Sequence, residues 1–183
     1  MTGVRTDVQG GSELCLACGI CCRGILHTHA VIQQDEIDQV HAMGLTAKKW
    51  GEVLGFPLPC PLFSEDFCPV YTNRLSPCRE YRCALLKKYE KNDTSLDQAL
   101  LIVHITKELL SDVIEHLPPG YTFTHLQKAI QGIQDTDENL LGSDALLQDN
   151  GIFFLKLGTL MFYLKENFVP SKEKAQSLCI APP

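Results

Sequence analysis

Residues 15–22 have the sequence CLACGICC, and this stretch decides how the rest of the chain is interpreted. Cys15, Cys18 and Cys21 follow one another at three-residue steps, and Cys22 comes directly after them. Two thiolates separated by two residues can hold one metal in a tight turn, and Gly19 permits the unusual backbone that such a turn needs. The stretch therefore predicts a metal centre bound through cysteine thiolates.

Four more cysteines lie downstream, and three of them have a proline neighbour in the sequence. Steps of three residues resemble the run of three ligands that bacterial ferredoxins give to a four-iron cluster, and a Cys-Pro pair marks the remote ligand in such runs. One partition places the first three cysteines and one remote cysteine on one centre, with the other four on a second. The predicted metal ligands are Cys15, Cys18, Cys21, Cys22, Cys60, Cys68, Cys78 and Cys83.

The cysteine distribution favours metal over disulfides. Of the nine cysteines, only Cys179 lies beyond Cys83, and we set it aside as a thiol that is not a ligand. The polar, Gly-rich stretch 1–13 has no apolar core of the kind that export needs, so we expect a cytoplasmic protein. In a reducing compartment, many cysteines indicate metal or redox chemistry.

Composition restricts the other function classes. With 45% apolar and 21% charged residues among 183, the chain has the balance of an ordinary globular protein. A net charge of −6 argues against a general nucleic-acid binder, because phosphate binding needs a basic surface. The longest apolar run, 152–164, contains Lys156 and is shorter than the roughly 20 residues of a membrane span, so no membrane contact is predicted.

The sequence divides near Leu85 into two regions that we expect to form one compact unit. Residues 13–84 are rich in cysteine and proline and predict an irregular metal-binding lobe. Residues 85–183 have helical periodicity. The predicted fold class is mainly α, with the irregular cysteine-rich lobe packed on a helical, bundle-like part.

Two short helices are expected in the lobe. The first covers 33–43, with Ile37, Val40 and His41 on one face, and the second covers 47–54 after a cap at Thr46. Residues 55–76 are expected to form loops and turns, because prolines recur through them.

The second region predicts three helices. Apolar residues at three- and four-residue steps predict a helix from a cap at Ser95 or Thr94 to Pro118, and a shorter one starts near Thr124. An acidic linker is expected at 135–150, followed by a buried helix at 152–167 that is apolar almost all round. If a face of its 152–164 part is exposed, it predicts a protein partner or an oligomer.

Several motifs occur in a fixed order along the first region: CxxCGxCC at 15–22, QDEI at 34–37, CPL at 60–62, CPVY at 68–71 and CRxY at 78–81. Together with Arg74, they resemble the CxxCxxCC cysteine-cluster family, a zinc- or iron-chelating domain, over roughly residues 13 to 83. The resemblance implies metal binding. A related group, the flagellin lysine methylases, carries a similar cysteine cluster.

Both zinc and an iron–sulfur cluster, of the 4Fe–4S type by preference, are compatible with these ligands. Basic residues nearby can offset the charge of the thiolates or donate hydrogen bonds to sulfur. Arg79 and Tyr81 are candidates for binding the cofactor, although charge neutralisation by Arg79 and packing by Tyr81 are the favoured explanations. His27 and His29 are close in sequence, but such histidines more often lie outside the ligand set.

The function predicted from these features is a metal-binding protein with a structural, sensor or electron-transfer role. The alternative is a cluster-dependent enzyme, for example a methylase-like modification enzyme, with its substrate held against the helical part. No acid–base pair or nucleophile has a spacing that is typical of a catalytic site, so the sequence identifies no catalytic residue.

Overall fold

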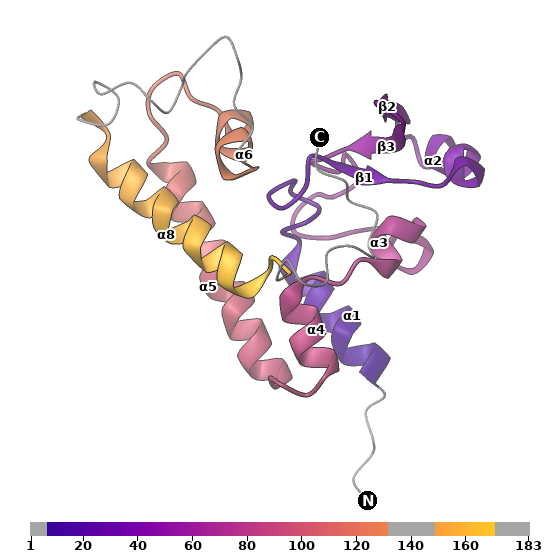
Figure 1. Cartoon of the computed structure of the whole chain (residues 1–183), viewed down its shortest axis with the longest axis horizontal. Coiled ribbons are helices and arrows are strands. Elements are labelled where there is room, and N and C mark those ends of the chain that lie inside the picture. Colours follow the sequence, from indigo (N-terminus) through magenta and orange to yellow (C-terminus); the bar gives the residue numbers. More distant parts are fainter. Residues whose placement is uncertain (1–6, 132–148, 171–183) are drawn as a thin grey trace, which may run out of the picture.

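The computed structural model describes residues 7–131 and 149–170 of the chain. Its elements, in order, are α1 Asp7–Cys18, β1 His29–Val31, η1 Gln34–Glu36, α2 Ile37–Ala42, β2 Lys48–Trp50, β3 Val53–Pro57, η2 Tyr71–Asn73, α3 Ser76–Glu80, α4 Ala84–Glu90, α5 Leu96–Glu115, α6 Phe123–Gln131 and α8 Gly151–Asn167. The predicted mainly helical fold class is confirmed, and a small three-stranded antiparallel sheet is added to it. Figure 1 shows the sheet and α2 at the upper right, α1 and α4 below them, and α5 and α8 side by side on the left.

The helix α1 was not expected, because its first half contains Gly10, Gly11 and Ser12, which are poor helix formers. Tertiary packing stabilises it. Leu14 is buried in a core shared with α4 and α5, and a Cβ at Gly11 would lie 3.4 Å from a methyl of Leu86. Cys15 and Cys18 consequently lie one turn apart on a helix, and not in the tight turn that their spacing first indicated.

The predicted helix 47–54 is wrong, because this stretch forms the hairpin of β2 and β3. Trp50 pairs with Val53 across a two-residue turn, and Gly51 has a φ of +61° there. A glycine at the first position of such a turn matches the twist of the two strands, which stabilises a hairpin against a helix. The strand β3 then pairs with β1 through Ala30 and Phe56, giving the strand order β1-β3-β2.

The predicted helix 33–43 is present as η1 followed by α2, with Gly44 at a φ of +75° after its end. Val40 is fully buried, as expected, but His41 is exposed and does not share the buried face. Ile32, Val40 and Phe56 belong to a small core between the sheet and α2.

In the second region the predicted helices are confirmed as α5, α6 and α8. Ser95 caps α5, since its side chain accepts from the amide of Gln98 while the Gln98 side chain accepts from the amide of Ser95. The expected acidic linker falls largely within 132–148, outside the described residues.

The expectation that α8 is buried all round is wrong. Phe153, Leu157, Leu160 and Leu164 are buried, and the helix lies along α5 (Figure 1). On its other side, the apolar side chains of Ile152, Leu155 and Phe162 are 63%, 73% and 66% exposed. Within the described residues α8 therefore buries one stripe and presents a second apolar stripe to solvent.

Candidate metal centre

All eight predicted cysteines line a single cavity of about 320 Å³. They come from α1, the turn after it, the loops around 60–68, α3 and the start of α4: Cys15, Cys18, Cys21, Cys22, Cys60, Cys68, Cys78 and Cys83. None of these eight forms a disulfide. The chemistry of this donor set, eight free sulfur atoms facing one space, fits a thiolate-bound metal centre. Cys179 lies outside the described residues.

The cavity lies between two hydrophobic cores. Leu14, Val103 and Phe168 contribute to its wall from the core of the helical part. Phe56 and Leu75 contribute from the core beside the sheet. The cysteines therefore occupy the seam where the sheet and the helical part face each other.

One group of cysteines surrounds the end of α1, and we call it the first set: Cys15, Cys18, Cys21 and Cys83. Cys83 is the N-cap of α4, and its sulfur accepts from the amide of Leu86 at 3.4 Å. The thiolate charges that would act on Cys21 are, in order of strength, those of Cys18, Cys83, Cys22 and Cys15, and those of Cys83 and Cys15 would act on Cys18. Because Coulomb interactions weaken with distance, these influences group Cys21 with Cys18, Cys83 and Cys15, and Cys22 is its neighbour in the chain.

A second set comprises Cys22, Cys60, Cys68 and Cys78. The charges acting most strongly on Cys22 would be those of Cys78, Cys60 and Cys68, in that order, and Cys60 and Cys68 would act on Cys78. A backbone hydrogen bond of 2.8 Å from the Cys60 amide to the Cys22 carbonyl joins the two parts of the chain that supply this set.

The turn after α1 directs neighbouring cysteines to different sets. Gly19, with a φ of +66°, ends the helix, and the Arg23 amide donates to its carbonyl at 2.9 Å. The Gly24 amide then donates to the Cys21 carbonyl at 2.9 Å. Cys21 faces the first set within this tight turn, while Cys22 belongs with the second.

The sulfur atoms are not drawn together as the ligands of one ion would be. Across 7–131 and 149–170, no three His, Cys, Asp or Glu side chains converge so as to hold a single metal ion. Four thiolates around one zinc require Zn–S distances of about 2.3 Å and hence closely packed sulfur atoms.

Burial keeps the free thiols protonated. Removal from water raises the pKa of Cys18 and of Cys22 to about 12 and that of Cys78 to about 11. It also raises the pKa of Cys15, Cys21, Cys60 and Cys83. Cys78 has exposed surface, yet it lines the cavity and its pKa is raised. Metal binding at these sulfur atoms must therefore displace protons.

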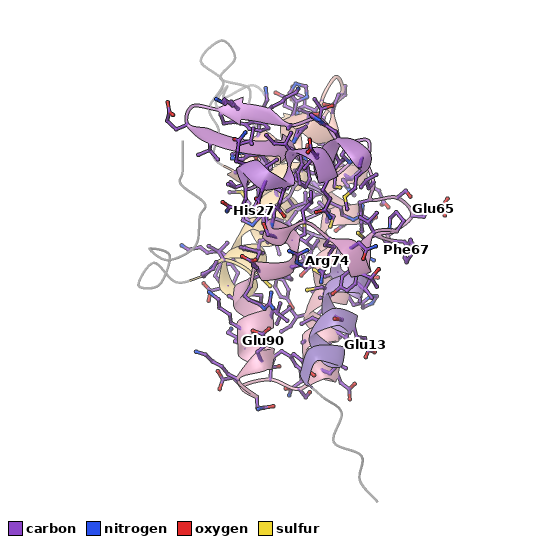
Figure 2. The ribbon with its side chains drawn as sticks, turned by 90° about the vertical axis from the view of Figure 1, so that its right-hand side faces the viewer. Glu13, His27, Glu65, Phe67, Arg74 and Glu90 are labelled. Carbon is purple, nitrogen blue, oxygen red and sulfur yellow. The ribbon has the colours of Figure 1, made fainter. Side chains whose placement is uncertain are left out.

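Arg74 reaches the cavity wall from the segment between η2 and α3. Its guanidinium carbon lies 3.5 Å from the ring centre of Tyr71, and its Nε is buried without a hydrogen-bond partner. Figure 2 shows Arg74 in the middle of the molecule, between the sheet and the lower helices. A buried donor without a partner is costly and commonly marks the place of a missing acceptor.

The two candidate cofactor-binding residues lie in different surroundings. Tyr81 lines the cavity, and its ring meets that of His27 edge-on at 4.7 Å. Arg79 is exposed, is not part of the lining, and donates to the Arg74 carbonyl at 2.5 Å.

Both candidate histidines line the cavity. His27 Nε2 is buried without a hydrogen-bond partner, and burial lowers the pKa of this side chain to about 4. His29 stacks on Trp50 at 4.5 Å.

Sequence reasoning missed the role of Glu36. Its carboxylate accepts from the amide and hydroxyl of Ser76, both at 2.6 Å, and from the Gln33 amide at 3.0 Å. These bonds fix the first residue of α3, which carries Cys78. Although burial would raise the pKa of Glu36, the hydrogen bonds from Ser76 and Gln33 outweigh it and lower the pKa. The only signal was the QDEI motif, which gives no hint of a partner 40 residues away.

Comparison with known proteins identifies the class of this region. Residues 14–98 match the family model CxxCxxCC, described as a "putative zinc- or iron-chelating domain", so this segment is similar to that family. The resemblance inferred from the motifs is thereby confirmed, and the match extends past Cys83 into α5. No curated protein and no solved structure matches the chain. Among the described helices, none is long and apolar enough to cross a membrane.

Proposed function

We propose that the chain is a two-centre iron–sulfur protein in which each set of four cysteines binds one cluster, with a role in electron transfer. The observation that carries this proposal is the division of eight cavity-lining cysteines into two sets of four. The family description supports iron or zinc chelation by this segment. The number of centres, the cluster type and the role are inferences.

The order of the ligands along the chain supports two clusters. In two-cluster ferredoxins, the first three cysteines of a run bind one cluster and the fourth binds the other. The run 15–22 follows the same logic, because its first three cysteines belong to the first set and Cys22 to the second. Cys83 then supplies the remote ligand of the first set.

The two sets meet in the run 15–22. Because the peptide between Cys21 and Cys22 joins the sets, two clusters bound there would be neighbours, as electron transfer requires.

A structural zinc role is the second candidate, and the position of the cavity favours it. The cysteines lie between the core of the helical part and the core beside the sheet. A metal at that seam would tie the two cores together, as structural zinc does in small domains.

Anaerobic purification and reconstitution test the proposal. Two 4Fe–4S clusters would give about eight iron and about eight sulfide per chain, with brown colour and visible absorption. Cys83→Ser and Cys68→Ser should each lose about half of the iron, whereas Cys179→Ser, the control, should lose none. A colourless protein with stoichiometric zinc would refute the iron–sulfur assignment. Loss of all the iron in either single variant would refute two separate centres.

The predicted partner or oligomer contact through 152–164 concerns the exposed stripe of α8. Its three apolar side chains, Ile152, Leu155 and Phe162, offer a surface for such a contact. The identity of an occupant stays a prediction.

A further inference from the structure

We propose that Arg74 is a tuning residue shared by both metal centres, lying between the two sets of cysteines with a free donor for bound sulfur. The inference rests on the proposed function, since it assumes that both sets are loaded. It goes beyond metal binding, because it makes one side chain control the electron affinity of two sites.

Two contacts fix the position of Arg74. Its guanidinium lies over the ring of Tyr71, whose hydroxyl donates to the Ser12 carbonyl of α1 at 3.1 Å. Its own carbonyl accepts from Arg79, and two residues further on α3 begins. Arg74 is therefore tied both to the helix that carries Cys15 and to the helix that carries Cys78.

Arg74 lies in the wall of the cavity that both sets of cysteines line. Its guanidinium is near enough to interact electrostatically with both Cys15 and Cys78. Cys15 belongs to the first set and Cys78 to the second.

The Nε of Arg74 is a hydrogen-bond donor that a ligand in the cavity could use. Nε is buried and has no acceptor among residues 7–131 and 149–170, although Arg74 lines the cavity. A buried guanidinium donor left unpaired is unfavourable, so an acceptor belongs there, and thiolate or cluster sulfur is the acceptor that the cavity would hold when loaded. Four thiolates on a divalent ion or a 2+ core leave about two negative charges per centre, which one cation between them partly offsets.

Arg82 provides the matched contrast. Its guanidinium is paired with Glu90 at 2.7 Å, it is not among the residues that line the cavity, and it adjoins only Cys83, a member of the first set. Removing Arg82 should therefore affect the first centre only. Lys88, exposed on α4, serves as a control for the loss of one charge.

The test measures the reduction potentials of both centres in the reconstituted full chain, by anaerobic titration followed by visible absorption and electron paramagnetic resonance. Cys83→Ser and Cys68→Ser assign the signals, because each should remove one centre. We expect Arg74→Gln to shift both potentials to more negative values, because reduction adds negative charge that Arg74 no longer offsets. Arg82→Gln should shift the first centre alone, and Lys88→Gln neither.

Arg74→Lys keeps the charge but loses the fixed fork of the guanidinium, so it should produce a smaller shift at both centres. It also serves if Arg74→Gln fails to fold. The variant that is measured, Arg74→Gln or its substitute Arg74→Lys, must keep the iron content of the wild type. Reduction potentials that then stay unchanged at both centres, or shift at one centre alone, would overturn the inference. A wild-type chain that binds no iron would instead overturn the proposed function. If that chain binds zinc, competition with a chelator should show weaker zinc binding at both centres in Arg74→Gln. Unchanged zinc binding in Arg74→Gln would overturn the shared role of Arg74.

Discussion

The side chain of Gln127 on α6 donates from Nε2 to the carbonyl oxygen of Arg23, at 2.9 Å. The same nitrogen lies 3.2 Å from the Gly24 carbonyl, which also accepts from Gln131 at 2.7 Å. Gln127 is only 6% exposed. A helix more than 100 residues away in the sequence thus holds the turn that presents Cys21 and Cys22.

Replacing Gln127 by leucine should destabilise the protein by about 1–3 kcal/mol, because the Arg23 carbonyl would be left buried without this donor. Chemical denaturation of the metal-free protein measures the change. Gln39→Leu is the matched control, since its amide donates to the Asn73 carbonyl at an exposed position and should cost less than about 0.5 kcal/mol. Equal losses in the two variants would contradict the role of Gln127.

Gly19→Ala should destabilise the turn after α1 in two ways. The residue has a φ of +66°, and a Cβ there would overlap the ring of Phe63. Gly44→Ala separates the effects, because Gly44 has a φ of +75° but open space around it. We expect a loss of about 1 kcal/mol for Gly44→Ala and clearly more for Gly19→Ala, by thermal unfolding. Adding Phe63→Leu to Gly19→Ala should recover part of the difference, and no recovery would argue against the overlap.

The stability of the metal-free protein should fall at alkaline pH. Thiols in the unfolded chain have a pKa of 9.0, whereas burial raises the pKa of Cys18 and Cys22 in the folded protein to about 12. The raised pKa values therefore stabilise the fold fully below pH 9, and this contribution is lost as the pH rises toward 12. Each such thiol contributes a slope of about 1.4 kcal/mol per pH unit between the two pKa values. Denaturation at pH 8 and pH 10, under anaerobic reducing conditions, measures the loss, and constant stability would contradict the shifts.

Metal removal should loosen the seam between the two cores before it unfolds either one. The cavity separates the core of α1, α4, α5 and α8 from the smaller core that contains Phe56. Without metal, we expect faster backbone hydrogen exchange in β1 and β3, while α5 keeps its protection. Mass spectrometry of loaded and metal-free protein measures this. Equal loss of protection in both regions would mean that the metal does not act at the seam.

The cysteine motif and the helical periodicity were sufficient to predict the metal-binding family and the helices α5, α6 and α8, because both are local signals. The hairpin of β2 and β3 was not predictable in the same way. Its residues have no strong alternation, and their pairing depends on Gly51 and on a third strand 20 residues earlier. The helix α1 was missed because packing against α4 and α5 outweighs the low propensity of its glycines.

The positions of the cysteines along the chain are enough to show which atoms are available for the metal: eight cysteines in two stretches, within a segment that matches the CxxCxxCC family model. Their grouping follows from the folded structure. Cys21 and Cys22 are neighbours in the chain, yet the turn between Gly19 and Gly24 directs them to different sets, and Cys83 joins the first set because α4 packs beside α1. Proximity of sulfur atoms depends on long-range packing of helices and loops, which spacing along the chain does not specify.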